Sequence, residues 1–159
     1  MSSLQITYDD IFSTFLESVT DYNLASLDKS EAYGLMSGWL RKGIKKSYVK
    51  RLFIESTLDD TAQIFTFQLL HPVKDETDED QIDFVKNVAS KAMIIEWCEP
   101  QVQRTTNIIQ GFFGKEQKFY SQSNHLAELR GLLEDTRKEL RQELGDHGVV
   151  NNTYLGTVE

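Results

Sequence analysis

The feature that most constrains the fold is a leucine stripe in the last third of the chain. Its members recur at the spacing of one face of an α-helix: Leu126, Leu129, Leu132, Leu133, Leu140 and Leu144. The pattern predicts a helix from about residue 119 to 144, which Gly145 and Gly148 are expected to end. An apolar stripe of this length must be covered by other elements. The sequence therefore predicts a mainly α fold, a helical bundle.

Four further helices are predicted upstream, over residues 8–20, 30–42, 81–99 and 101–112. Thr7 and Asp10 have the spacing of a capping box before the first. The segment 92–98 is apolar nearly all round, which indicates the most buried helix. Pro100 predicts a kink or a break after it, because proline lacks an N–H and clashes with the preceding turn. One core is expected to bury Trp39, Met93, Trp97 and Leu133.

The helix over 30–42 is rich in glycine, which lowers its intrinsic stability. Asp28 or Ser30 is expected to precede its first turn, and Gly43 is expected to end it. Gly34 and Gly38 would allow a neighbouring backbone to approach closely.

The middle of the chain supports two interpretations. Residues 48–55 and 63–71 are rich in β-branched and aromatic side chains, with a turn-like segment between them, which favours a β-hairpin within 48–71. A helical interpretation of the first of these segments is nearly as good. Pro72 ends whatever precedes it.

The length of 159 residues is enough for one core. We expect a single helical domain over residues 1–146 and an extended C-terminal arm over 147–159, outside any helical pattern. The arm carries apolar residues that are candidates for docking on a partner: Val149, Val150, Tyr154 and Leu155. The longest apolar run is four residues and the N-terminus has no signal-peptide pattern, so neither a membrane span nor a secretory signal is expected.

Charge is distributed unevenly along the chain. Lysine and arginine total 17 against 25 acidic residues, a net charge of −8, which disfavours a general nucleic-acid binder. Positive charges nevertheless gather in one stretch: Arg41, Lys42, Lys45, Lys46, Lys50 and Arg51. Negative charges gather in another, in which Lys74 is the only basic residue: Asp75, Glu76, Asp78, Glu79, Asp80 and Asp83.

Catalytic and metal-binding motifs are not found. The three histidines, His71, His125 and His147, have no metal-ligand spacing, and no nucleotide-binding or nucleophile motif occurs. Glu96 and Glu99 lie one turn apart, as in an acid–base pair, but a polar stripe on a buried helix explains them better. Cys98 lies in an apolar segment, as a small core residue does. We therefore expect no enzyme and no cofactor.

Four segments together resemble a known family: YDDIFSTFLESVTDY, GWLRKGIKKSYVKRLF, IIEWCEPQV and GKEQKFYSQSNHLAELRGLLEDTRKELR. They are similar to the small, mostly helical head-completion proteins of tailed bacteriophages, also called head–tail connectors or neck adaptors. The resemblance covers about residues 7 to 155. It implies a structural virion protein without a catalytic motif, assembled in the host cytoplasm.

The resemblance also implies partners. Such proteins form a homo-oligomeric ring beneath the portal protein, join it to a tail-side neck protein and complete the DNA-filled head. The basic and acidic stretches would then be contacts between neighbouring subunits. Two other interpretations stay open: both stretches are solvated loops, or the basic one lines the lumen and contacts packaged DNA without sequence specificity.

The competing function class is a small acidic monomeric protein that binds and inhibits a host factor. Another tail or neck assembly protein is a further alternative. Oligomeric state, with and without a portal ring, discriminates between a ring protein and a monomeric inhibitor.

Overall fold

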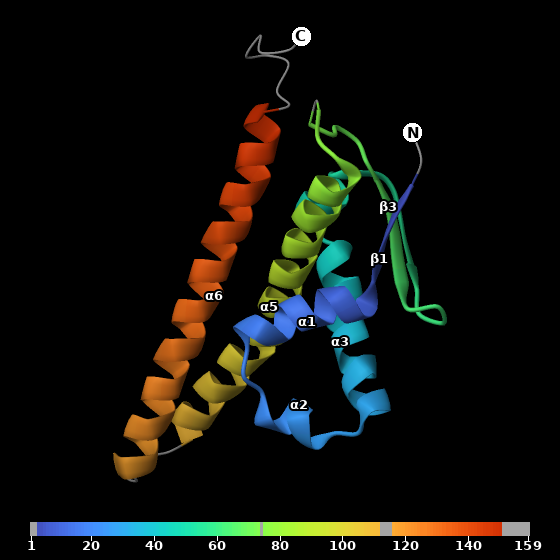
Figure 1. Ribbon diagram of the computed structural model, residues 1–159. Helices are drawn as coiled ribbons and strands as arrows, with labels where there is room; N and C mark the ends of the chain where they lie inside the picture. The colour runs from blue at the N-terminus through green and yellow to red at the C-terminus, as the bar shows by residue number, and fades with distance from the viewer. Residues whose placement is uncertain (1–2, 74, 112–115, 151–159) are drawn as a thin grey trace.

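The computed structural model describes residues 3–73, 75–111 and 116–150. It is 71% helical with one small antiparallel sheet, which confirms the mainly α class (Figure 1). The helices are α1 (Tyr8–Ser18), α2 (Tyr22–Ser26), α3 (Lys29–Ile44), α4 (Ser47–Lys50), α5 (Asp78–Gly111) and α6 (Glu116–Val150). The strands are β1 (Leu4–Thr7), β2 (Phe53–Asp59) and β3 (Ile64–Leu69).

Short polar side chains cap the helices at their starts. Thr7 Oγ1 accepts the backbone N–H of Asp10 at α1, so the predicted capping box is present in its first half. Asp28 caps α3, which decides between the two expected starts. Helix α5 begins at Asp78, before the expected residue 81, and Thr77 caps it: Thr77 Oγ1 accepts from the Asp80 N–H, and the Asp80 carboxylate accepts from the Thr77 N–H. These bonds satisfy amide groups that the first helical turn leaves unpaired.

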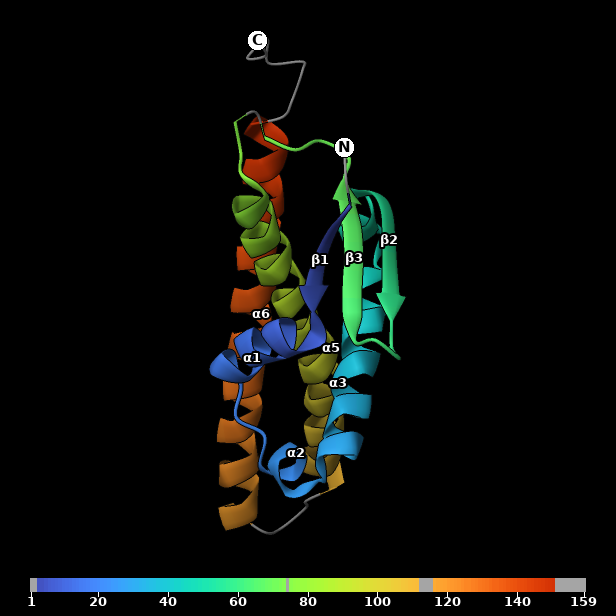
Figure 2. The same cartoon turned by 45° about the vertical axis from the view of Figure 1, so that its right-hand side comes forward.

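The hairpin predicted within 48–71 is present as β2 and β3. The sheet order is β1-β3-β2, with both pairs antiparallel, so β1 and β2 form its edges (Figure 2). Phe65, Phe67 and Leu69 of β3 alternate onto the buried face. Sequence reasoning missed β1, because four residues before a capping box carry too short a pattern. Tyr48 lies in the short helix α4, so the hairpin begins later than its expected first residue.

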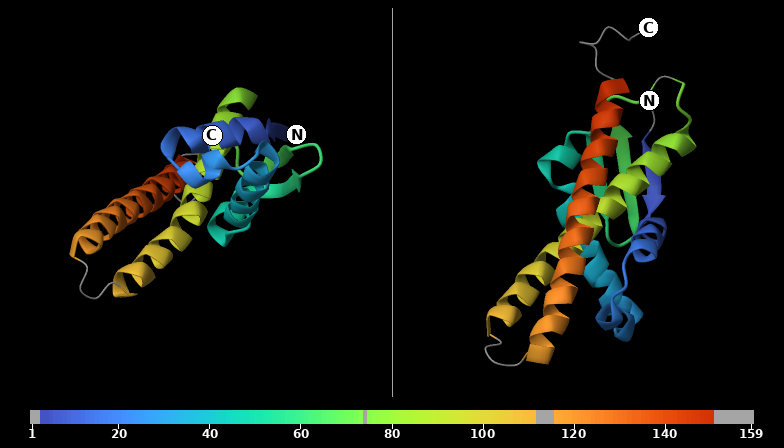
Figure 3. Two further views of the ribbon diagram at one scale, coloured as in Figure 1. Left: turned by 90° about the horizontal axis from the view of Figure 1, so that it is seen from below. Right: turned by 90° about the vertical axis from the view of Figure 1, so that its left-hand side faces the viewer.

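The core surrounds α5. Helices α1, α3 and α6 and the strand β1 all contact it, and α6 runs back along it as an antiparallel hairpin (Figures 1 and 3). The predicted burial is confirmed for Met93, Trp97 and Leu133. Trp39 is only partly buried and packs at the edge of the same core, with its ring 5.7 Å from that of Phe15.

Of the kink or break expected at Pro100, the break does not occur, because α5 continues through this residue to Gly111. Proline cannot supply the hydrogen bond to the carbonyl four residues earlier. Packing against neighbouring elements holds the helix on both sides of this defect. Cys98 Sγ lies 3.2 Å from the Leu129 carbonyl oxygen, and Thr105 is buried beyond the proline. Tertiary packing therefore outweighs the local preference for a break.

The expected end of the last helix is also wrong, because α6 continues past Gly145 and Gly148 to Val150. Its last turns pack on α5: Lys91 pairs with Glu143, and the ring of His147 stacks on Phe84. Residues 147–150 of the expected arm thus belong to the helix. The remainder of the arm, with Tyr154 and Leu155, lies outside the described residues.

The glycines of α3 have different roles from those expected. A Cβ at Gly34 or Gly38 would meet no atom within 4 Å, so neither marks a close approach. Gly43 is not the end of the helix but the crossing point of α3 and α5. A Cβ at this position would lie 2.8 Å from Ala92 Cβ and 3.1 Å from the Ala92 carbonyl carbon.

Candidate functional site

Arg41, the first residue of the basic stretch, belongs to a structural cluster. Its guanidinium donates to Asp60 Oδ2 at 2.6 Å, and the Tyr8 hydroxyl donates to Asp60 Oδ1 at 2.7 Å. The Tyr8 hydrogen bond, with help from Arg41, lowers the pKa of Asp60, whereas burial raises the pKa of Tyr8. This cluster ties α1 and α3 to the β2–β3 turn, so Arg41 is a fold contact.

Lys46 is also engaged within the chain. Its Nζ lies 3.4 Å from Glu96 Oε1, and the Glu96 side chain is only 10% exposed. The neighbouring carboxylate of Glu96 raises the pKa of Lys46. Lys46 therefore neutralises a carboxylate that burial would otherwise penalise.

The rest of the basic stretch faces solvent. Four of its residues are exposed and form no ion pair among the residues that the structure describes: Lys42, Lys45, Lys50 and Arg51. They surround the end of α3 and the short helix α4. These four are the members of the predicted set that remain available to a partner.

The acidic stretch likewise contains residues bonded within the fold and residues exposed to solvent. Asp80 is used in the cap of α5, and Glu76 accepts the backbone N–H of Val73 at 3.2 Å. Asp75 has a positive φ of 65°, a conformation that aspartate tolerates in turns. Asp78 and Glu79 are exposed in the first turn of α5, and no described cation pairs with them.

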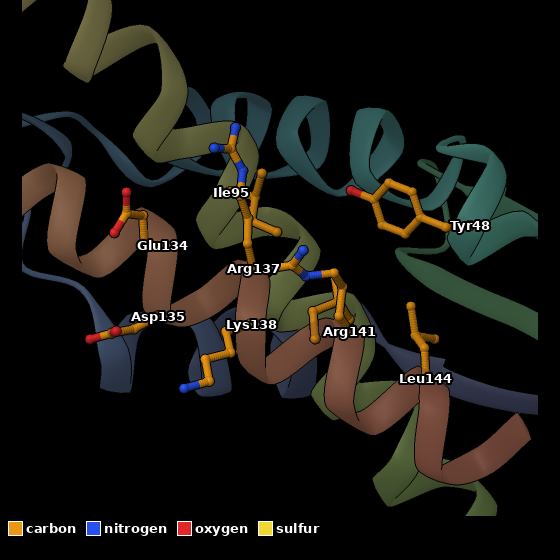
Figure 4. A pocket seen from close by; sticks show the side chains of 9 residues that line it. Tyr48, Ile95, Glu134, Asp135, Arg137, Lys138, Arg141 and Leu144 are labelled. Atoms are coloured by element: carbon orange, nitrogen blue, oxygen red, sulfur yellow. The ribbon is translucent and has the colours of Figure 1, made fainter. Parts of the chain in front are cut away.

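A groove lies between α4 and the C-terminal half of α6. It has a volume of about 950 Å³ and its floor includes Ile95 of α5. Its lining is mainly apolar, with charged side chains from α6 around it: Tyr48, Ile95, Glu134, Asp135, Arg137, Lys138, Leu140, Arg141 and Leu144. In Figure 4, Arg141 rises from α6 with its guanidinium turned toward Arg137, and Tyr48 lies across the groove, whereas Lys138, Glu134 and Asp135 point away from Tyr48.

The groove joins two basic segments that are distant in the sequence. Tyr48 follows Lys46 on one wall, and Arg137 and Arg141 lie one turn apart on the other. Arg137 donates to Glu99 Oε1 at 2.5 Å, whereas Arg141 forms no ion pair among the described residues. Burial raises the pKa of Tyr48, so its hydroxyl stays protonated at neutral pH. Among the described residues, Arg141 and Lys138 are the lining cations without an ion pair, and Lys138 points away from Tyr48.

The structure does not bring the basic and acidic stretches together within one chain. In the right-hand view of Figure 3 the teal segment that holds α4 lies on one side of α6, and the light-green start of α5 lies on the other. Both lie toward the end of the molecule where α6 finishes. The two stretches are thus separate surfaces that face in different directions.

The other chemical candidates take part in contacts within the fold. Glu96 and Glu99 each pair with a different cation, Lys46 and Arg137 respectively. Burial raises the pKa of the Cys98 thiol to about 11, as expected of a core residue. His125 is exposed on α6. Among the described residues no three histidine, cysteine or acidic side chains converge as metal ligands would.

Comparison with known proteins gives no relative: no family model, no curated protein and no solved structure matches this chain. No helix in the described part of the chain is both long enough and apolar enough to cross a membrane.

Sequence reasoning found the charged stretches but missed the α6 wall of the groove. Arg137 and Arg141 lie one turn apart on the polar side of the leucine helix, a spacing that was visible in the sequence. Nothing in that spacing showed that Tyr48, about ninety residues earlier, faces them. The pairing required the fold.

Proposed function

We propose that this chain is a structural protein of a tailed-bacteriophage neck. In this proposal it forms a homo-oligomeric ring that binds the portal, joins it to a tail-side neck protein and completes the DNA-filled head. The four sequence segments that resemble head-completion proteins support this function. All four contribute to the central packing: the first forms α1, the second spans the end of α3 and the helix α4, the third forms the middle of α5, and the last forms much of α6.

One observation carries the proposal: the segment with the exposed basic residues and the acidic start of α5 lie on different sides of α6 (Figure 3). A ring subunit presents one surface to one neighbour and a different surface to the other, which is a heterologous contact. Opposite charges suit such a contact, since neither surface needs to be complementary to itself. A monomeric inhibitor, in contrast, does not require two surfaces of opposite charge.

The proposal includes the arm beyond α6. A short apolar segment can dock by adding a strand to an exposed sheet edge, and β1 and β2 are both edges. Truncation after Val150 leaves every described helix intact. It is expected to preserve the far-UV circular dichroism spectrum and the melting temperature while reducing assembly or head completion. Unchanged assembly by the truncated protein would remove the arm from the proposal.

Light scattering coupled to size exclusion tests the ring directly, with purified protein over a range of concentrations and with or without a portal ring. We expect higher oligomers at high concentration or on the portal. A strictly monomeric protein that never binds the portal would refute the neck function and favour the small inhibitor of a host factor. Cryo-electron microscopy of the virion neck would then decide independently whether the chain is present.

A further inference from the structure

We propose that the groove between α4 and α6 is the receptor half of the contact between subunits, and that it binds the acidic start of α5 from a second copy. This inference rests on the proposed ring. Beyond the ring itself, it specifies the groove as the contact surface, including residues of α6 outside the predicted basic stretch. It also names the segment that binds there, the start of α5.

The groove offers an apolar surface beside a cation. Leu144 supplies partly exposed aliphatic surface, and Tyr48, which is 38% exposed, adds an aromatic ring. Ile95 and Leu140 line the groove but are themselves buried. Removing such surface from water favours association. Arg141 lines the groove from α6, across from Tyr48 of α4. A guanidinium binds carboxylates through two parallel hydrogen bonds, which adds geometric specificity to the contact.

The start of α5 has the complementary chemistry. Asp78 and Glu79 are exposed in its first turn and have no cationic partner among the described residues. The capping bonds between Thr77 and Asp80 fix the backbone of this turn. Two carboxylates on a fixed backbone lose little conformational freedom when they bind. The start of α5 cannot bind the groove of its own subunit, because that turn lies on the other side of α6 from the groove (Figure 3).

The charges of the groove also set the direction of binding. Glu134 and Asp135 line the part of the groove nearer the start of α6, two turns before Arg141. Like charges placed together oppose binding. The acidic turn of the neighbouring subunit is therefore expected at the end formed by Arg141, Leu144 and Tyr48. Lys50 is exposed on the same short helix as Tyr48.

The structure decides which charges can be reversed without damage to the fold. Lys46 is left unchanged, because its replacement would leave the buried carboxylate of Glu96 without a cationic partner. Asp80 must stay as part of the α5 cap. The groove variant is therefore Lys50→Glu with Arg141→Glu. The α5 variant is Asp78→Lys with Glu79→Lys.

Each variant alone is expected to associate at least about tenfold more weakly than the wild type, with unchanged circular dichroism and melting temperature. The control is Lys29→Glu with Arg104→Glu, which changes the net charge as the groove variant does but lies away from the groove. It is expected to assemble like the wild type.

Mixing the two variants in equal amounts is the deciding experiment. The reversed groove of one matches the reversed α5 start of the other, and the two remaining surfaces match as in the wild type. The mixture is therefore expected to form alternating assemblies that neither variant forms alone, measured by light scattering at physiological salt.

The outcomes separate this inference from the ring itself. If the wild type assembles and both variants assemble equally well, the groove assignment is wrong and the ring stands. If both variants are folded and monomeric but the mixture stays monomeric, the pairing of these two surfaces is wrong. If the groove variant assembles normally but loses binding to DNA, the basic surface faces the lumen. A wild type that never assembles, with or without the portal, refutes both proposals.

Discussion

Replacing Gly43 with alanine is expected to destabilise the protein, although the same change at Gly38 or Gly34 stabilises it. Alanine is favoured over glycine within a helix by about 0.5–1 kcal/mol. At Gly34 and Gly38 the added methyl group meets no atom within 4 Å, so the full gain is expected. Both controls lie in the same helix, α3, and receive the same methyl group.

At Gly43 the methyl group would lie 2.8 Å from Ala92 Cβ and 3.1 Å from the Ala92 carbonyl carbon. Carbon atoms in ordinary contact are about 3.5–4.0 Å apart, so α3 and α5 would have to separate by up to about 1 Å. Backbone atoms cannot rotate away as a flexible side chain does. Such overpacking typically costs about 1–3 kcal/mol. Subtracting the helix gain leaves a net loss of up to about 2 kcal/mol.

Urea unfolding followed by far-UV circular dichroism measures the effect. We expect the free energy of unfolding of Gly43→Ala to lie about 1–3 kcal/mol below that of Gly38→Ala. This corresponds to roughly 2–4 °C in melting temperature for each kcal/mol. Ala92→Gly, introduced into the Gly43→Ala protein, should recover part of the loss in a double-mutant cycle. Equal stabilisation by alanine at positions 43 and 38 would refute the close crossing.

Three further changes test the core and the end of the helical hairpin. Leu133→Ala is expected to lower the free energy of unfolding by about 2–5 kcal/mol, because it leaves a cavity between α5 and α6; an unchanged urea midpoint would contradict its burial. Burial lowers the pKa of His147 in the folded chain, so its contribution to stability is present above the usual pKa near 6.5 and is lost as pH falls through the lower, folded value. The melting temperature should therefore fall on mild acidification, and His147→Gln should remove that part of the pH dependence. Cys98, with a pKa raised to about 11, should react with a thiol reagent far more slowly in the native protein than in urea, and equal rates would show that it is exposed.

Much of the secondary structure could be predicted because its signals are local. Thr7 and Asp28 cap the helices that follow them, and their spacing from the next residues is visible in the sequence. The alternation of Phe65, Phe67 and Leu69 gives the second strand of the hairpin. The leucine spacing gives α6 over most of its length. These patterns depend on residues within one or two turns of each other.

Several wrong predictions share one cause, which is that packing between distant segments outweighed a local preference. Pro100 and Gly145 each predict an interruption, yet α5 and α6 pack against each other on both sides of these positions. Gly43 was expected to end a helix, and only the position of Ala92 shows that it permits a crossing.

For the candidate site, too, some features could be predicted from the sequence and others required the tertiary structure. The sequence by itself determined that the chain has one basic and one acidic stretch, because charge is a property of each residue. Only the tertiary structure decided which of these charges are already paired within the chain. Arg41 and Lys46 form ion pairs with Asp60 and Glu96, and Asp80 accepts a hydrogen bond in the cap of α5. It also placed Arg141 on the wall opposite Tyr48. Ion pairs and grooves depend on distances in space, and separation along the chain does not determine those distances.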